Sequence, residues 1–202
     1  KKNLHIAYGH TSHGSQIISG LLGLTEFKKS PYIYKEGSPA DSLDLRDNPF
    51  SEAYLDLGQP DNKTWALETR KYLDANKDIN VVMWSWCGQL SSAGKEYVEN
   101  YLSMMQELEK QYPGVAFVYM TGHLDGSGEN WTLAKNNKRI REFCTNNGKV
   151  LYDFADIESY DPDGNYFGDK YANDACDYDG DDFGRKPDKN WAKEWQDAHT
   201  VG

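Results

Sequence analysis

Short apolar runs alternate along this chain with longer segments of helical period, and that alternation restricts the folds open to it. Four runs read as buried strands, at residues 4–8, 79–86, 115–120 and 149–154. Helical spacing of apolar side chains begins at about residue 14 and recurs over about 62–74, 91–112 and 130–146. Strands that alternate with helices of this length build βαβ units. The sequence therefore predicts a three-layer α/β/α domain with a mostly parallel sheet.

A single domain is expected over residues 1–202. A chain of 202 residues falls close to the usual size of one domain and buries a core without needing disulfides. Prolines punctuate residues 25–63, which are expected to be mostly loop. Residues at about 155–187 form a loop region rich in Asp and Gly, and a last short helix is expected at about 188–197.

The charge of the chain is concentrated in one segment. The whole sequence has 22 Lys and Arg against 32 Asp and Glu, a net charge of −10. Residues 153–184 hold 11 of these acids and a single base, Lys170, so the remainder of the chain is balanced. This distribution argues against nucleic acid as a partner and favours a cation near the acidic segment. No apolar run approaches the roughly 20 residues that cross a bilayer, so no membrane span is expected.

The first loop carries the most informative residues. In an open parallel sheet, sites form at the carboxyl ends of the strands. Residues 9–15 there read Gly-His-Thr-Ser-His-Gly-Ser, directly after the first strand and before a helix. Ser12 on such a turn is exposed as a nucleophile, next to a helix N-terminus that stabilises an oxyanion. The alternative is that Ser12 only caps the helix and that both histidines are surface loop residues.

This chain resembles the SGNH/GDSL hydrolase superfamily in the order of its segments. A strand is followed by GHTSHGSQ and a helix, and later comes VVMWSWCGQL. The resemblance implies a flavodoxin-like topology with Ser12 as nucleophile. It also implies that Gly88 and Gln89 contribute to the oxyanion hole, with Gln89 where the superfamily has Asn. The second-block glycine has no clear match, and Gly58 is the candidate. The usual Gly-Asp-Ser opening is absent.

The catalytic base implied by the resemblance is a histidine in an Asp-x-x-His motif near the C-terminus. This chain offers Asp197-Ala198-His199, which is one residue shorter. His199 is therefore predicted as the base and Asp197 as the residue that orients it. The alternative is that the chain ends before its fold does. The base would then lie beyond residue 202, and the outer strand at 149–154 would be covered by a missing helix or by self-assembly.

The resemblance further implies a serine esterase acting on a small ester or an ester-bearing carbohydrate, such as an acetylated one. His10, His13, His123 and Trp86 are predicted to contact this substrate. For His123, a solvated or capping role is an equal alternative. Zinc bound through His10 and His13 is disfavoured, because their spacing of three begins in a turn and no HExxH motif is present. The competing function is a non-catalytic extracellular module that binds calcium or glycans, or that assembles with other chains.

Two loops in the acidic region have the residue types that hold Ca²⁺, a cation that takes 6–8 oxygen ligands. The predicted ligands are Asp161, Asp163 and Asn165 in one loop and Asp177, Asp179 and Asp181 in the other. Neither loop is a full EF-hand. The alternative is that both are solvated Asp-Gly turns. No organic cofactor is expected.

A secreted or periplasmic location is expected from the many Tyr, Trp, Asn and Gly residues and the acidic charge. The chain is expected to be a processed, mature form, because it begins at Lys1 and leads directly into an apolar strand. Its three cysteines, Cys87, Cys144 and Cys176, leave at least one unpaired and form no CxxC motif.

Overall fold

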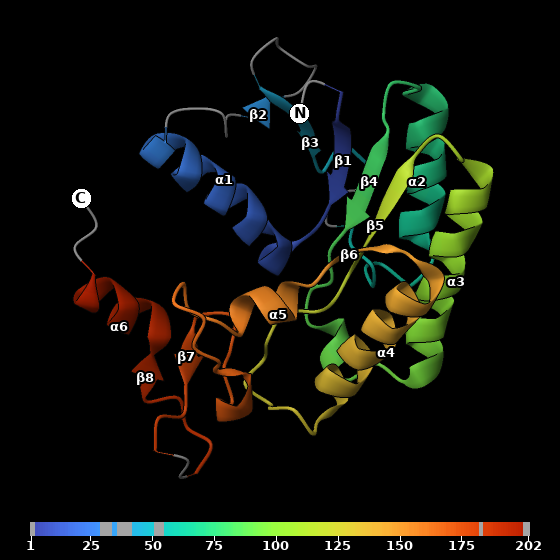
Figure 1. Cartoon of the computed structure of the whole chain (residues 1–202). Helices are drawn as coiled ribbons and strands as arrows, with labels where there is room; N and C mark the ends of the chain where they lie inside the picture. Colours follow the sequence, from blue (N-terminus) through green and yellow to red (C-terminus); the bar gives the residue numbers. More distant parts are fainter. Residues whose placement is uncertain (1–2, 29–33, 36–41, 51–54, 182–183, 200–202) are drawn as a thin grey trace.

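The computed structural model describes residues 3–28, 34–35, 42–50, 55–181 and 184–199. Its main sheet has six strands in the order β2-β3-β1-β4-β5-β6, all parallel (Figure 1). Their bounds are β1 His5–Gly9, β2 Tyr34–Lys35, β3 Leu43–Asp47, β4 Val81–Trp84, β5 Ala116–Met120 and β6 Val150–Tyr152. Without the short β2, this is the flavodoxin-like order. The predicted fold class is confirmed.

Helices cover both faces of the sheet. They are α1 Ser15–Lys28, α2 Thr64–Ala75, α3 Lys95–Gln111, α4 Thr132–Asn147, α5 Phe154–Glu158 and α6 Trp191–Ala198. Figure 1 shows α2, α3 and α4 on one side and α1 on the other. Gly148 ends α4 in the left-handed conformation (φ 61°), as its Asn-Gly sequence predicts.

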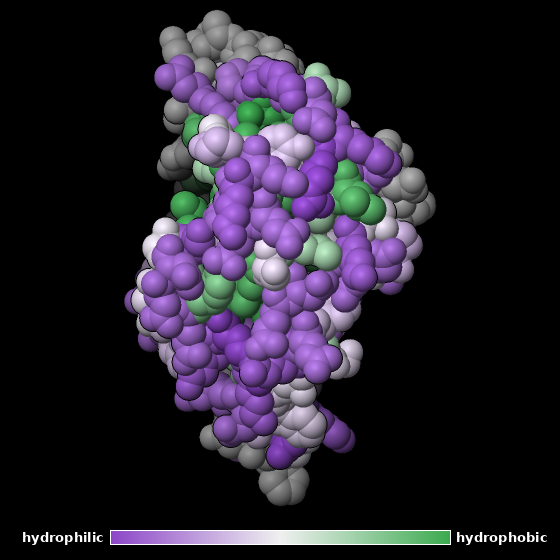
Figure 2. Space-filling model, turned by 90° about the vertical axis from the view of Figure 1, so that its right-hand side faces the viewer, coloured by the Kyte–Doolittle hydropathy of each residue, from purple (hydrophilic) through white to green (hydrophobic). Residues whose placement is uncertain are grey.

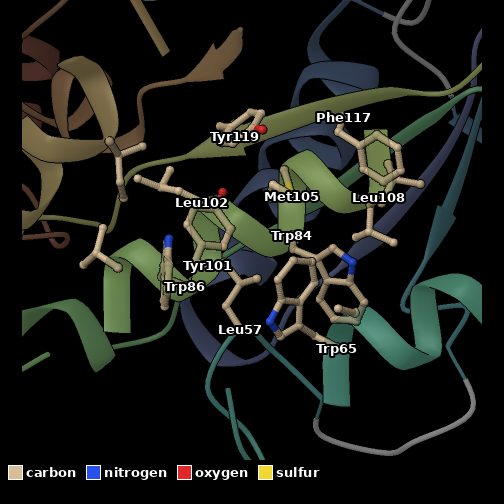
Figure 3. Close-up of a cluster of buried hydrophobic side chains, with 14 of the residues drawn as sticks. Leu57, Trp65, Trp84, Trp86, Tyr101, Leu102, Met105, Leu108, Phe117 and Tyr119 are labelled. Carbon is tan, nitrogen blue, oxygen red and sulfur yellow. The ribbon is translucent and has the colours of Figure 1, made fainter. Parts of the chain in front are cut away.

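The larger core lies between the sheet and α2–α4 and is dominated by aromatic side chains (Figure 3). Trp65, Trp84 and Trp86 are each at most 1% exposed. The Trp86 ring packs edge-on against Tyr101 with centroids 4.8 Å apart. The indole N–H of Trp84 donates to Thr69 Oγ1, so this burial leaves its polar atom satisfied.

The core on the opposite face is smaller, because α1 is the helix that covers it. Its buried members are Tyr8, Ile18, Leu45, Met83 and Met120. Figure 2 views the outer side of the α2–α4 layer, where hydrophilic residues surround small hydrophobic areas. No helix in the described ranges is both long and apolar enough to span a membrane.

The sequence missed β3, which falls in the segment expected to be loop. The strand pattern is hidden there because charged residues alternate with leucines. Asp44 of β3 is nevertheless only 1% exposed. It accepts hydrogen bonds from His5 Nδ1 (2.7 Å) and Arg46 Nη2 (3.3 Å), which satisfy its buried carboxylate.

The last segment forms a small separate cluster instead of covering the sheet. The two-stranded pair β7 (Asp177–Tyr178) and β8 (Lys189–Asn190) leads into α6. Phe167, Ala172 and Tyr178 are its buried apolar members, and Trp191 packs on them. None of the residues of α6 is itself buried. The late helix is thus confirmed, and its Trp191 packs on this small cluster.

Candidate functional site

The carboxyl ends of β1, β4, β5 and β6 meet at one edge of the sheet, because these strands are parallel neighbours. The loops that follow them contain Ser12, Gln89, His123 and Asp153, respectively. The fold therefore gathers the loops expected at this edge. Figure 1 shows α5 and the segment after it on the same side.

Ser12 occupies an unusual backbone position. Its φ is 33°, a positive value that residues with a side chain rarely adopt. It is exposed and begins a short 3-10 helix, Ser12–Gly14, that leads into α1. Strained residues of this kind cluster at functional sites. The Ser12 hydroxyl is thus presented to solvent, and it has no hydrogen-bond partner among the described residues.

Asp56 organises the residues on one side of Ser12. Its carboxylate is fully buried and accepts three hydrogen bonds. The donors are Thr11 Oγ1 (2.5 Å), the Gly58 backbone N–H (2.7 Å) and Gln89 Nε2 (3.0 Å). Thr11 directly precedes Ser12. The three loops that the resemblance assigns to nucleophile and oxyanion hole are thus joined through one carboxylate.

Gln89 is held in a defined orientation by contacts at both ends of its amide. Its Oε1 accepts the Cys87 backbone N–H (2.9 Å), while Nε2 donates to Asp56. Because an amide nitrogen carries two hydrogens, the second remains to be donated to a substrate. A Cβ on Gly58 would lie 2.6 Å from Gln89 Cγ, so glycine is required for this approach.

A cluster of histidines and carboxylates, His13, His123, Glu158 and Asp174, lies on the other side of Ser12. His13 is 6% exposed, with Nε2 2.9 Å from Glu158 Oε1 and Nδ1 3.0 Å from Asp174 Oδ2. The ring of His123 stacks on that of His13 with centroids 3.8 Å apart. His123 Nδ1 contacts the carbonyl oxygen of Leu124 (2.8 Å) and therefore carries the hydrogen, which leaves Nε2 as the free acceptor.

Two groups of donor atoms in the described ranges are close enough to hold a metal ion. One is His13, His123 and Asp174, and the other is His5, Asp44 and Asp78. In the first group the imidazole planes are stacked at 21°. Since nitrogen lone pairs lie in the ring plane, stacked rings direct them along parallel lines rather than toward one ion. Coordination by both histidines would require one ring to turn.

The predicted substrate contacts His10 and Trp86 are corrected by the structure. His10 is 6% exposed, bonds through Nε2 to Asp47 Oδ1 (2.7 Å) and stacks on Tyr8. Trp86 is 1% exposed and donates its indole N–H to the Met120 carbonyl (3.0 Å). Both side chains are therefore buried and hydrogen-bonded within the protein, which leaves little of their surface for contact with a substrate.

The structure does not bring His199 and Asp197 together with Ser12. His199 lies at the C-terminal end of α6, where its Nδ1 contacts the Trp195 carbonyl (2.8 Å) and Nε2 lies 3.5 Å from Asp163. Asp197 pairs with Lys193 (2.7 Å) on the same helix. In the described part of the chain, no ring nitrogen of any histidine forms a hydrogen bond with Ser12.

The predicted calcium ligands lie in two loops with different surroundings. The Asp161 carboxylate accepts backbone N–H groups of its own loop, and the residue is half-buried. Asp179 is fully buried, and its Oδ2 has no hydrogen-bond partner. No three of the five predicted aspartates form a metal-sized group in the described ranges. The calcium expectation remains a prediction, with the isolated Asp179 oxygen as its structural support.

Sequence reasoning missed Asp56, Glu158 and Asp174. A signal was available for Asp56, because it stands between Leu55 and Leu57, which are both buried. An acid enclosed by core residues needs several donors and is therefore a candidate for an organising role. Glu158 and Asp174 were read as members of the acidic region, and no local signal distinguishes them from their neighbours.

Comparisons with known proteins identify no family for this chain. No family model matches the sequence, and no curated protein matches it. Among solved structures, the periplasmic domain of a lipopolysaccharide acetyltransferase from Salmonella ser. Paratyphi A is similar at 12% identity and a TM-score of 0.39. The match covers 83% of this chain and 72% of that chain. A likeness at this level carries no argument about function, so the site geometry alone must support the proposal.

Proposed function

We propose that this protein is a serine esterase of SGNH type, with Ser12 as the nucleophile. The exposed hydroxyl of Ser12 on its positive-φ turn is the observation that carries the proposal. Ser12 Oγ attacks the acyl carbon of an ester. The first N–H groups of a helix lack acceptors in the preceding turn, so those of Ser12 and His13 are suited to stabilise the resulting oxyanion. Gln89, oriented by Asp56, and Gly88 supply further donors.

His123 is the proposed proton acceptor in place of His199. His123 stacks on the residue that follows Ser12, and its Nε2 is the acceptor nitrogen because Nδ1 donates to Leu124. His13 is unsuited to this role, since both of its ring nitrogens face carboxylates. Asp174 Oδ2, 3.9 Å from His123 Nδ1, would stabilise the positive charge that develops on the ring.

The proposed reaction has two steps. In the first, the Ser12 Oγ–C bond forms, the ester C–O bond breaks, and His123 passes the Ser12 proton to the departing alcohol oxygen. In the second, water gives a proton to His123 while its oxygen bonds to the acyl carbon. The Ser12 Oγ–C bond then breaks, His123 returns the proton to Oγ, and the carboxylic acid leaves. An ester on a carbohydrate, such as an acetyl ester, is the proposed substrate class.

The nucleophile is tested by the hydrolysis of p-nitrophenyl acetate. Ser12→Ala should lower kcat by at least about 10³-fold, the scale of removing a catalytic serine. Ser19→Ala, an exposed serine further along α1, is the matched control. If Ser12→Ala retains more than about a tenth of the wild-type rate, the proposal is wrong, and a binding module becomes the better account. Loss of activity on chelation would instead indicate metal-assisted hydrolysis at the histidine cluster.

The base is tested by His123→Ala and His199→Ala in parallel. General-base removal costs about 10²–10⁴-fold in rate, and added imidazole should restore part of the activity of His123→Ala. His199→Ala should retain the wild-type pH profile. Loss and imidazole rescue in His199→Ala instead would assign the base to the C-terminal helix, as the resemblance implies.

We also propose a bound cation at Asp179, in the loop whose predicted ligands include Asp177 and Asp181. An ionised carboxylate buried with an unpaired oxygen is costly unless a cation or donor compensates it. Lys170 is the basic residue of the acidic segment 153–184. Its Nζ lies over the rings of Phe167 and Tyr178, 5.5 and 5.6 Å from their centroids. Ca²⁺ is the ion whose hard oxygen preference suits these ligands.

A further inference from the structure

A cavity of about 330 Å³ opens next to the histidine cluster and takes no part in the chemistry described above. Its walls come from the β5–α4 loop, α4, α5 and the loop that follows α5. The wall begins at Leu124, the residue directly after His123. Its volume falls in the range of small-molecule sites.

Two aromatic rings give the cavity an apolar surface. Tyr160 and Tyr166 are each 40% exposed, and their ring centroids lie 5.1 Å apart. Their backbones are joined by an antiparallel bridge, which fixes the rings relative to one another. The Tyr166 hydroxyl donates to Glu129, so this ring is also held at its outer end. Half-exposed aromatic faces of this kind pack against the C–H face of a ring ligand.

The remaining wall is polar and slightly acidic. Asp125, Glu129 and Asp156 line it, together with the basic residues Lys138 and Arg141. Arg141 is already paired with Asp153 through two hydrogen bonds (2.5 and 2.8 Å). The wall therefore offers many hydrogen-bonding groups without a net positive charge. This combination suits an uncharged polyhydroxyl ring and disfavours an anionic one.

The position of the cavity relative to Ser12 follows from the sheet. β1 and β5 are separated by β4 alone, so their carboxyl ends lie two strand spacings apart, or about 10 Å. The cavity adjoins the loop of His123, which follows β5, whereas Asp56 lies in the segment that follows β3, on the opposite side of β1. In ester cleavage the alcohol leaves toward the residue that protonates it, so the leaving group belongs on the base side.

We infer that this cavity binds the sugar alcohol of the ester substrate, as an uncharged sugar ring stacked on Tyr160 and Tyr166. The inference rests on the proposed function and adds to it a specific site for the leaving group. The small acyl group would then lie toward Asp56, on the β3 side of Ser12. An acyl ester of a simple phenol uses the same nucleophile and base but presents no sugar ring to the tyrosines.

The test compares two substrates, β-D-glucose pentaacetate and p-nitrophenyl acetate. Tyr160→Ala should lower the ratio of kcat/KM for the sugar acetate to that for the phenyl ester by about tenfold. Ala134→Phe, which fills the cavity from α4 without removing a polar group, should lower the same ratio. Phe27→Ala, an exposed aromatic on α1, is the control and should leave the ratio unchanged. An unchanged ratio in both cavity variants overturns the inference.

Failure of the proposed function is distinguished by a binding measurement. Saturation-transfer NMR with glucose pentaacetate is recorded on Ser12→Ala, with and without Tyr160→Ala. A signal that is present in Ser12→Ala and lost when Tyr160→Ala is added supports sugar binding in the cavity. This holds even if Ser12→Ala hydrolyses the phenyl ester normally. No signal in either variant, or an equal signal in both, contradicts it.

Discussion

At the scale of single residues, the site depends on a few side chains that are held by unusual surroundings. Ser12 adopts a positive φ, and Asp56 is a buried carboxylate that accepts three hydrogen bonds without a Lys or Arg among its described donors. Such an arrangement costs free energy, which suggests that it is retained because it orients Thr11, Gly58 and Gln89.

Asp56→Asn tests this orienting role. The substitution keeps the shape but places an N–H group where one of the carboxylate oxygens accepts. We expect a loss of stability of about 1–3 kcal/mol from the unmatched buried group. We also expect a drop in kcat of about tenfold or more, because the Gln89 amide loses its support. Asp74→Asn, an exposed acid on α2, is the control for both measurements, which are thermal unfolding and ester hydrolysis. Wild-type kcat in a folded Asp56→Asn variant would remove Asp56 from the account.

At the scale of the elements, α5 is fixed to the sheet edge by Asp153. This carboxylate caps α5 through the Asp156 N–H, accepts from Thr121 Oγ1 (3.0 Å) and pairs with Arg141. Burial acts to raise the pKa of Asp153, but the hydrogen bonds and the charge of Arg141 outweigh it and hold the pKa below the ordinary 3.8. The ionised form therefore stabilises the fold.

Asp153→Asn should reveal this contribution as a pH-dependent difference. Because the pKa is lower in the folded state, the stabilisation is fully present above pH 3.8 and is lost as the pH falls through the folded-state value. At pH 7 the variant should unfold about 3–10 °C below the wild type, for a loss of roughly 1–3 kcal/mol. The gap should narrow below pH 4, whereas the exposed neighbour Asp156→Asn should show little effect at either pH. A gap that stays constant from pH 7 to pH 3 would contradict the assignment.

The sequence predicted elements well where one physical signal dominates. The apolar run at 79–86 and the periodic stripe of α3 required burial, and both became central elements of the larger core. β3 was missed because its charged residues are satisfied by side chains distant in sequence, such as His5.

The site residues were likewise predictable where the signal is local. Ser12 was recognisable from its Gly-bounded turn, but the cluster of His13 with Glu158 and Asp174 joins residues about 145–161 positions apart, which local pattern does not reveal.

At the scale of the whole molecule, the acidic segment after β6 contributes residues to two different clusters. Glu158 and Asp174 turn inward and hold the histidine cluster. The loop with Asp177, Asp179 and Asp181 turns away and forms a small cluster with β7, β8 and α6. This division places the proposed cation away from the proposed nucleophile, so the ion should stabilise the fold rather than assist the chemistry.

Calcium should therefore raise the melting temperature and have little effect on the rate of hydrolysis by the folded protein. Saturating Ca²⁺ at about a hundredfold excess over Kd contributes about 2.7 kcal/mol, or roughly 5–10 °C for a chain of this size. Asp179→Asn should abolish this shift, whereas Glu99→Gln on α3 should preserve it. Identical melting curves in calcium and in EDTA, with no metal found by elemental analysis, would end the proposal.

The most direct test of the central claim is to label the protein with a fluorophosphonate probe and locate the adduct by mass spectrometry. We expect a single adduct on Ser12, formed by the wild type and by Ser19→Ala but absent from Ser12→Ala. We also expect slower labelling of His123→Ala, with partial recovery in imidazole. No adduct on the folded wild-type protein, or an adduct on another serine that persists in Ser12→Ala, would contradict the assignment of Ser12 as a nucleophile.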